Sequence, residues 1–586
     1  MLQIVGHPPS DPVSTWFAEF EAAAVSPGAR AFLDLLSSDA CWRDLLGLTW
    51  DLQTVCGSAG TARALASAVA TSGAKAFRVE DIHLATRVGR ETAEVFFRFE
   101  TRVGRGRGIV RLLSDPGAPS RLRAWTLLTA LEDLKGFEER SGRNRPRGQS
   151  HSRDFRGPNW LDKRRNAQIY DGAEPAALVI GGGQAGLAIA ARLRTLGVDT
   201  LLIERNARIG DNWRHRYHAL TLHNQVQVNH LPYMPFPPNW PTYIPKDKLA
   251  NWLESYAEAM ELNVWTGTEM LGGDYDEAAG RWTVTLRRED GSRREMHPRH
   301  VIMATGVSGI PNRPDIPSLR DFAGAVLHSS EYRDGEDWSG RRAIVIGTGN
   351  SGHDIAQDLQ SSGARVTVVQ RSPTLVVNIE PSAQLPYGLY DEGRPLDECD
   401  LITVSMPFPL LREAHRAFTE RARALDRTLL DRLEMAGFRL DFGEDGTGWQ
   451  FKYLTRGGGY YFNVGCSDLI ADGKIGVVQY ERIDRFVADG VRMTDGRMID
   501  ADLVVLATGY KGQEHLVARL FGPDTARRVG PIWGFGDGLE LRNMYCRTRQ
   551  PGLWFIAGSL AQCRIYSRYL GLQIKAVEEG LLPRTI

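Results

Sequence analysis

The sequence has little that would direct it to a membrane or to nucleic acid. Its 586 residues carry 71 basic and 71 acidic side chains, so no net charge favours nucleic acid or an anionic lipid surface. No apolar run approaches the ~18 residues of a membrane helix. The first residues, MLQIVGHPPSDPV, lack the charged and apolar regions of a signal peptide. We therefore expect a cytoplasmic protein that acts on a small molecule.

Cysteine is also scarce, and its spacing excludes two kinds of site. None of the six cysteines forms a C-x-x-C pair, which argues against a zinc site and against a dithiol redox centre. We expect no bound metal and expect the thiols to be reduced. The six are Cys41, Cys56, Cys399, Cys466, Cys546 and Cys563.

What the chain does have is a glycine motif that follows a predicted strand. Residues 176–186 read AALVIGGGQAG, with Gly181, Gly183 and Gly186 in G-x-G-x-x-G spacing before a predicted helix. These glycines permit a tight turn, close approach to a pyrophosphate and close helix–strand packing. The next predicted strand ends at Glu204, at the offset expected for a carboxylate that binds a ribose. The motif predicts a dinucleotide site rather than an ordinary glycine-rich turn.

A second glycine motif repeats the first. Gly347, Gly349 and Gly352 lie in AIVIGTGNSG, between a predicted strand and a predicted helix. At the end of the following strand, Arg371 stands near the position where an NAD site carries an acid. Arginine can pair with a 2′-phosphate, so this site predicts a preference for NADPH, although a plain surface arginine is the alternative.

Residues 1–140 predict a separate small α+β domain, and residues 141–173 a linker that begins with the polar, basic stretch 141–154. We expect a helix at 29–36 and strands at 93–101, 108–113 and 122–129. The runs CWRDL at 41–45 and WTLL at 125–128 resemble the NTF2-like fold. In that fold the cone can bind a small molecule, catalyse or dimerise, so Asp44 is either a pocket acid or a structural residue.

The stretch between the glycine motifs carries a longer fingerprint, F-x-G-x-x-x-H-x-x-x-Y. Its residues are Phe322, Gly324, His328 and Tyr332. Together with ATGY at 507–510, it resembles the flavin-containing monooxygenase branch of the class B flavoprotein monooxygenases. The loop 231–237, LPYMPFP, is similar to the plant auxin-forming branch, which oxidises indole-3-pyruvate.

The resemblance covers residues 174–586 and implies an α/β fold with two Rossmann-like domains. FAD would bind to residues 174–335 and 500–586, and NADPH to residues 336–499, which include a charged helical insertion at 411–437. It also implies cofactor contacts near Trp213, Thr508, Gly509, Gly558 and Ser559. The flavin-facing asparagine of the family falls on either His223 or Asn224. His328 and Tyr332 are expected to hold the inter-domain linker.

The implied activity is NADPH-dependent insertion of one atom of O₂ into a small organic substrate through a flavin C4a-(hydro)peroxide. The loop at 231–237 favours an aromatic 2-oxo acid such as indole-3-pyruvate. Nitrogen or sulfur oxygenation, Baeyer–Villiger oxygenation and an uncoupled NADPH oxidase are the alternatives. A disulfide reductase lacks its dithiol here, and a non-catalytic binding protein would not need two intact glycine motifs. The N-terminal domain could add a second activity, shield the active site or support a homodimer.

Overall fold

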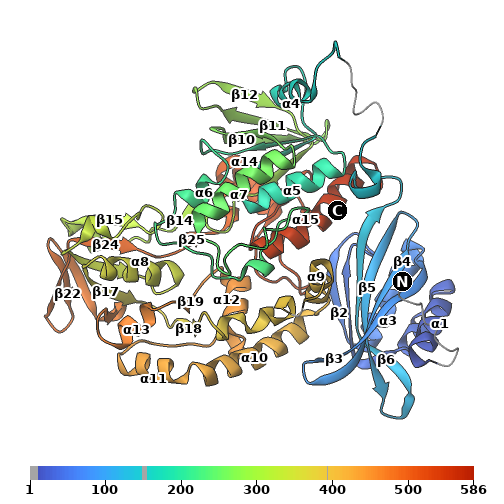
Figure 1. Cartoon of the computed structure of the whole chain (residues 1–586), viewed down its shortest axis with the longest axis horizontal. Helices are drawn as coiled ribbons and strands as arrows, with labels where there is room; N and C mark the ends of the chain where they lie inside the picture. Colours follow the sequence, from blue (N-terminus) through green and yellow to red (C-terminus); the bar gives the residue numbers. More distant parts are fainter. Residues whose placement is uncertain (1–10, 148–154, 392, 586) are drawn as a thin grey trace.

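A computed structural model describes residues 11–147, 155–391 and 393–585. The chain forms an N-terminal sheet domain beside an elongated body that contains two parallel sheets (Figure 1). Part of the predicted linker and most of the first residues examined for a signal peptide lie outside the described residues. Within the described ranges, no helix has the length and apolar character needed to cross a bilayer.

The N-terminal sheet has six strands in the order β2-β1-β6-β5-β4-β3, antiparallel except for the β1–β6 pair. Its strands are β1 (Leu36–Leu45), β2 (Leu52–Cys56), β3 (Lys75–Arg87), β4 (Arg90–Glu100), β5 (Gly104–Asp115) and β6 (Ala118–Leu134). Three helices pack on one face: α1 (Pro12–Val25), α2 (Ala29–Leu33) and α3 (Ser58–Ser72). The helix expected at 29–36 is therefore shorter than predicted, because β1 begins at Leu36.

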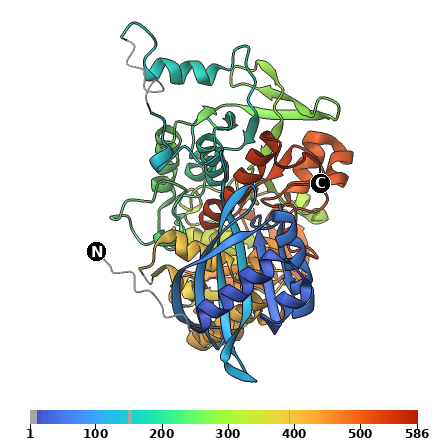
Figure 2. The same cartoon turned by 90° about the vertical axis from the view of Figure 1, so that its right-hand side faces the viewer.

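Side chains alternate between the two faces of this sheet along each strand, and both faces are buried. Trp42 and Phe97 belong to the aromatic core beneath α1–α3. Their neighbours Leu45 and Phe96 belong instead to the core of the main body. The N-terminal domain therefore docks through the second face of its sheet, and Figure 2 shows it in front of the body.

The first parallel sheet has the order β26-β13-β7-β8-β9 and carries the first glycine motif. Its strands are β7 (Ala177–Ile180), β8 (Thr200–Ile203), β9 (Asn263–Trp265), β13 (His300–Met303) and β26 (Leu553–Phe555). Around it lie α4 (Trp160–Ile169), α5 (Gln184–Thr195), α6 (Asp211–Arg214), α7 (Lys246–Ala259), α14 (Gln513–Val529) and α15 (Leu560–Glu578), with the antiparallel strands β10 (Glu269–Asp276), β11 (Arg281–Arg287) and β12 (Arg293–Met296).

The second parallel sheet has the order β15-β24-β16-β17-β20 and carries the second glycine motif. Its strands are β15 (Ala325–His328), β16 (Arg342–Ile346), β17 (Arg365–Gln370), β20 (Gly476–Gln479) and β24 (Leu503–Leu506), with α8 (Asn350–Ser361) and α13 (Cys466–Ala471) packed on it. A small antiparallel sheet follows: β21 (Ile483–Val487), β22 (Gly490–Met493) and β23 (Met498–Asp500). β15 and β24 join this sheet although the expected division gave both to the first.

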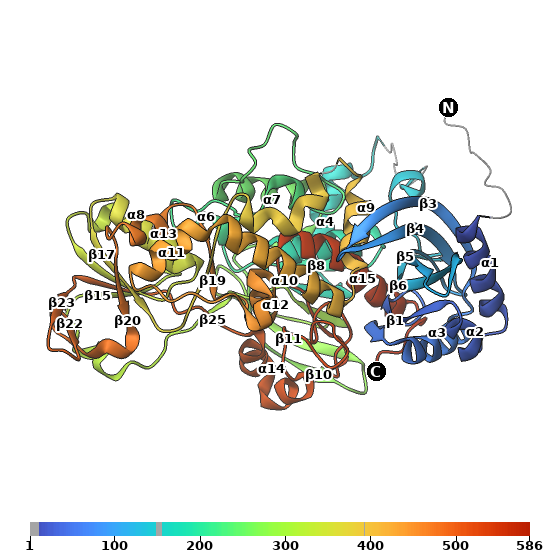
Figure 3. The same cartoon turned by 90° about the horizontal axis from the view of Figure 1, so that it is seen from below.

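The helical insertion lies between the second sheet and the N-terminal domain (Figure 3). It comprises η6 (Ser382–Asp391), α9 (Leu396–Val404), α10 (Phe408–Leu425), α11 (Arg427–Met435) and α12 (Gly448–Arg456), bounded by the paired strands β18 (Leu375–Asn378) and β19 (Tyr460–Asn463). The two-stranded pair β14 (Ile310–Pro311) and β25 (Tyr510–Lys511) crosses between the two sheets. The insertion is thus larger than the stretch 411–437 expected from charge and periodicity alone.

Two cysteines correct an expectation. Cys41 and Cys56 are cross-strand partners in β1 and β2 and form a disulfide. The expectation of reduced thiols is therefore wrong for this pair, because the spacing of cysteines in the sequence does not show which strands pair. The other four cysteines form no disulfide.

Candidate active site

The first glycine motif forms a tight turn at the carboxyl end of β7. A Cβ atom at Gly186 would lie 1.9 Å from the carbonyl oxygen of Gly181, and Gly181 itself has a φ of 110°. Gly183 is the residue before α5, so the free N–H groups of this helix face the open end of the motif. The turn therefore forms the cradle that a pyrophosphate requires.

Glu204 lies at the end of β8, as predicted, and its carboxylate is buried. One oxygen accepts a hydrogen bond from the Gly182 N–H at 2.8 Å, and the other accepts from the backbone and side chain of Asn206. The carboxylate therefore braces the glycine turn while it lines the adjoining cavity.

That cavity has a volume of about 1290 Å³ and begins at the carboxyl ends of the first sheet, where open α/β sheets bind their ligands. Four residues that line it have a buried polar atom without a hydrogen-bond partner in the described structure. One is Gln450 Oε1, and the other three are Asn212 Oδ1, Trp213 Nε1 and Asn224 Oδ1. Buried polar atoms normally have partners, so these three fit a polar ligand such as FAD beside the glycine cradle.

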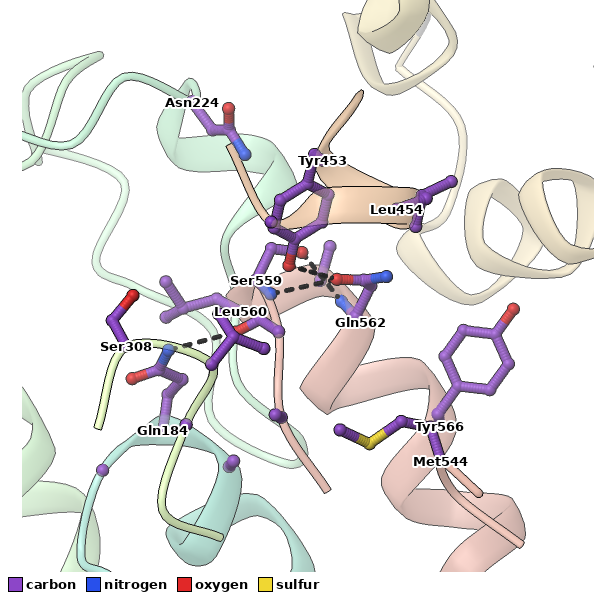
Figure 4. Close-up of a pocket in the computed structure, with 18 of the residues that line it drawn as sticks. Gln184, Asn224, Ser308, Tyr453, Leu454, Met544, Ser559, Leu560, Gln562 and Tyr566 are labelled. Atoms are coloured by element: carbon purple, nitrogen blue, oxygen red, sulfur yellow. Dashed lines mark hydrogen bonds between the residues drawn. The ribbon is translucent and has the colours of Figure 1, made fainter. Parts of the chain in front are cut away.

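The start of α15 forms a second polar edge of this cavity (Figure 4). Ser559 caps the helix: its side chain accepts from Gln562 N, and Gln562 Oε1 accepts from Ser559 N. The Tyr453 hydroxyl from α12 donates to the same Gln562 Oε1 at 2.8 Å. Gln184 Nε2 donates to the Gly558 carbonyl at 3.1 Å and so ties the first glycine motif to this helix.

His223 and Asn224 both line the cavity, but their surroundings differ. His223 is exposed where it lines the cavity, and its ring packs edge-on against Phe462 at 4.7 Å. Desolvation by the surrounding protein lowers its pKa to about 4. Asn224 is 9% exposed, and its Nδ2 donates weakly to the Tyr387 hydroxyl at 3.4 Å. His223 is therefore neutral near pH 7, whereas the Oδ1 atom of Asn224 has no hydrogen-bond partner in the described structure.

The second glycine motif has the same geometry as the first. A Cβ at Gly352 would lie 2.0 Å from the Gly347 carbonyl oxygen, and one at Gly347 would lie 2.2 Å from the Ala507 carbonyl oxygen. Gly349 precedes α8, and Arg371 is exposed just beyond the end of β17. Its neighbour Gln370 is buried and exchanges two hydrogen bonds with the Arg439 backbone.

The fingerprint residues support the fold and do not line the cavity. Gly324 makes room for Phe322, because a Cβ there would lie 2.5 Å from the phenyl ring. His328 Nε2 donates to the Gly509 carbonyl at 3.1 Å, and the Tyr332 hydroxyl donates to Asp358 on α8 at 2.6 Å. Both contacts fix the linker against the second sheet.

Thr508 and Gly509 also lie outside the cavity lining. The Thr508 hydroxyl donates to the Asn312 carbonyl at 2.6 Å, and Asn312 N donates to Gly509 O at 2.9 Å. In the described structure these residues join the segments on either side of β14 and β25, and Tyr510, the next residue, reaches the cavity.

The N-terminal domain supplies part of the cavity wall. Shielding of the active site was one of the roles expected for it, but the residues that line the cavity were not predicted. Leu52, Val88 and the guanidinium-bearing residues Arg43 and Arg87 are among the lining residues. Arg43 forms a bidentate ion pair with Glu540 at 2.7 and 2.6 Å and also donates to the Tyr566 hydroxyl at 3.1 Å. These partners lie about 500 positions away in sequence, so no local pattern signals the contact.

Asp44 is a structural residue rather than a pocket acid. It is fully buried, and its carboxylate accepts from the Leu48 and Thr49 backbone and from the Thr129 hydroxyl. Burial raises its pKa to about 6.

Sequence reasoning also missed Gln184, Tyr453 and Gln562. The capping-box spacing of Ser559 and Gln562 was a usable signal, because S-x-x-Q predicts a helix start. Nothing local marks Tyr453, because its role comes from packing of the insertion.

Comparisons with known proteins show which proteins this chain is similar to. Residues 178–387 match the family model described as pyridine nucleotide-disulphide oxidoreductase. The chain is 34% identical over 347 residues to an indole-3-pyruvate monooxygenase (YUCCA1) of Oryza sativa subsp. japonica, covering 58% of this chain and 77% of that protein. A probable indole-3-pyruvate monooxygenase (YUCCA8) of Arabidopsis thaliana is 30% identical, covering 57% and 74%.

Solved structures show the same fold. A cyclohexanone monooxygenase with bound ε-caprolactone has a TM-score of 0.52 at 19% identity, covering 69% of this chain and 88% of that one. The NADP⁺-bound cyclohexanone monooxygenase of Rhodococcus sp. Phi1 has a TM-score of 0.50 at 17% identity, covering 69% and 85%.

Two dinucleotide cradles, the first of which opens into the cavity, are typical of a two-cofactor oxidoreductase. By its similarity to these relatives, the chain belongs to the flavin-containing monooxygenase family. It is a flavin-dependent monooxygenase, and FAD and NADP are its cofactors.

Proposed function

We propose that this enzyme oxygenates an aromatic 2-oxo acid, such as indole-3-pyruvate, with NADPH as the electron donor. The observation that carries the proposal is the aromatic cavity that continues from the FAD cradle past Asn224. Its wall includes Tyr387, Phe408, Trp449, Tyr460 and Phe535. An aromatic lining of this kind favours an aromatic ligand, and the relatives at 30–34% identity are named for indole-3-pyruvate.

The reaction balances with the two cofactors. The bond between the carboxyl carbon and the carbonyl carbon breaks, the carboxyl group leaves as CO₂, and the carbonyl carbon becomes a new carboxylate. One oxygen atom of O₂ enters this carboxylate. The other leaves as water with the hydride of NADPH and a proton.

FAD, when bound, supplies the activation of O₂. The residues that would hold it are Gly181, Gly183, Gly186, Trp213 and Glu204, with Gly558 and Ser559 at the start of α15. The α15 N-terminus would present free N–H groups and a positive dipole end to the bound cofactor. Tyr453 and Gln562 line the cavity beside this helix end, and their hydrogen bond at 2.8 Å fixes both side chains there.

Asn224 is the residue we assign to the flavin-facing position. Its amide can both donate and accept a hydrogen bond, and its Oδ1 lacks a partner in the described structure. His223 would support it through packing, because a ring whose pKa is about 4 does not donate as an imidazolium at pH 7.

NADPH would bind through Gly347, Gly349 and Gly352, with Arg371 on the 2′-phosphate. An exposed guanidinium just beyond β17 supports this assignment. We also propose that residues 11–140 are an NTF2-like domain, supported by a six-stranded sheet covered on one face by three helices. The FAD and NADP domain division, a cytoplasmic location and a homodimer complete the proposal, and sedimentation of the purified protein checks the last.

A substrate panel with product mass spectrometry tests this function. The panel should contain 2-oxo acids, amines, thioethers and ketones, with catalase present because H₂O₂ alone decarboxylates 2-oxo acids. We expect the acid shortened by one carbon as the product from indole-3-pyruvate. Oxygenation of an amine, thioether or ketone in its place would move the assignment to that class. NADPH consumption without any product would make the protein an oxidase.

A further inference from the structure

The tip of the β3–β4 hairpin brings positive charge to the substrate cavity. Thr86, Arg87 and Val88 at this tip line the cavity, and the Arg87 side chain is 23% exposed, so it lies where the cavity meets solvent. The relatives match only 57–58% of the chain, and Arg87 belongs to the added N-terminal domain.

The hairpin is held in place from behind. Arg111 is fully buried on the next strand, β5, and its guanidinium donates to the Ser405 hydroxyl at 2.7 Å and to the Ser405 carbonyl at 3.3 Å. Ser405 follows α9 of the insertion. The N-terminal sheet is therefore fixed against the helices that form the aromatic wall.

The ionised side chains around the hairpin include one more cation than anions. Glu94 is fully buried and lies between two guanidinium groups: Arg111 at 2.8 Å and Arg87 at 3.0 Å. These two arginines hold the pKa of Glu94 below its usual value against the effect of burial. Two cations share one carboxylate, and the described residues place no second carboxylate within ion-pair distance of Arg87.

The rest of the outer cavity does not cancel this charge. Among the lining residues from the N-terminal domain, the insertion and the segment around α15, the other charged groups are Arg43 and Glu540, which pair with each other. Burial lowers the pKa of His415 to about 3, so it is neutral. An anionic group on an otherwise apolar ligand would therefore find its partner at Arg87.

We propose that Arg87 is a specificity-determining residue through which the N-terminal domain recognises an aromatic organic anion, a carboxylate above all. This inference rests on the proposed function, because it concerns the ligand of the same cavity.

Two ligands of equal size that differ in charge test it. Isothermal titration calorimetry of the oxidised holoenzyme would compare indole-3-acetate with indole-3-acetamide at low ionic strength. We expect the acid to bind about tenfold more tightly, as one charge-assisted contact provides. Arg87→Met should remove this difference by weakening only the acid. The variant should still fold, because Glu94 keeps Arg111.

Arg90→Met is the matched control. Arg90 is the cross-strand partner of Arg87 but pairs with Asp39 and does not line the cavity. It should leave the preference for the acid unchanged. Equal binding of acid and amide by the unaltered enzyme, no binding of the acid, or the same effect from Arg90→Met would overturn the inference.

Neither ligand carries a 2-oxo group, so the measurement does not depend on oxygenation. A protein that prefers the acid but forms no oxygenated product keeps this inference and loses the proposed function. A protein that oxygenates 2-oxo acids but does not prefer the acid over the amide keeps the proposed function and loses this inference.

Discussion

At the scale of single residues, burial decides which ionisable groups can act. His353 and His415 are buried, and their pKa values fall to about 4 and 3. His223 is exposed where it lines the cavity, and desolvation by the surrounding protein lowers its pKa to about 4. Sequence inspection could mark His223 as a candidate, but it could not show this environment. Asn224 remains the better candidate because an amide needs no change of charge to bind.

His415 should make the fold sensitive to acid. The unfolded chain protonates this residue as the pH falls through about 6.5, whereas the folded protein resists protonation until about pH 3. Between these values the unfolded state binds more protons, so stability is lost as the pH falls. His415→Phe should therefore reduce the slope of the free energy of unfolding against pH in this range. The reduction should correspond to up to about one proton. Urea midpoints measured from pH 7 to pH 4 check this, and the exposed His218→Gln should leave the slope unchanged.

Arg371 should set the choice of nicotinamide cofactor. Arg371→Ala should raise the KM for NADPH about tenfold or more, because one charge-assisted phosphate contact is lost. The KM for NADH should change little. Arg365→Ala is the matched control, since Arg365 is exposed at the opposite end of β17. Steady-state kinetics with both cofactors decide the point, and equal changes for NADPH and NADH would contradict the assignment.

At the scale of elements, sequence patterns predicted most accurately the structures that are held by contacts between residues close in sequence. Both glycine motifs form strand–turn–helix units, because the shortest clash distance in each, Gly186 to Gly181 and Gly352 to Gly347, joins residues five positions apart. The assignment of β15 and β24 to the second sheet could not be predicted in this way. Their hydrogen bonds join residues more than 170 positions apart, as Val326 and Val504 show. The insertion was underestimated for the same reason, since its wall residues meet only in the folded chain.

The two glycine motifs offer a paired test. Gly186→Ala would force a methyl group to within 1.9 Å of the Gly181 oxygen, and Gly352→Ala would do the same in the second motif at 2.0 Å. We expect Gly186→Ala to lose most of its FAD absorbance. Gly352→Ala should keep FAD but be reduced slowly by NADPH. Flavin stoichiometry and anaerobic reduction rates measure both effects. Loss of FAD from Gly352→Ala alone would reverse the assignment of the two sites.

At the scale of the whole molecule, the N-terminal domain belongs to the active-site structure. The sequence separated this domain by composition and predicted three of its six strands. Shielding of the active site was one expected role, but the docking contacts were not predicted. Arg43 and Glu540 meet across 497 positions, with side chains 10% and 14% exposed. A composition boundary therefore identified a folding unit without showing what the unit contacts.

Breaking this contact should be costly, because it leaves a buried carboxylate without its partner. Arg43→Met should lower the free energy of unfolding by about 3 kcal/mol. The double variant Arg43→Met/Glu540→Met removes both charges and should lose less. Chemical denaturation compares the three proteins. A double variant less stable than the single one would show that the pair does not act as described.

The most direct test of the account follows the oxygen atom itself. The enzyme would be supplied with NADPH, ¹⁸O₂, indole-3-pyruvate and an excess of catalase, and the product examined by mass spectrometry. We predict a carboxylate product shortened by one carbon that carries one ¹⁸O atom, with one NADPH consumed for each product molecule. Consumption of NADPH with no labelled product from this substrate or the wider panel would contradict the account.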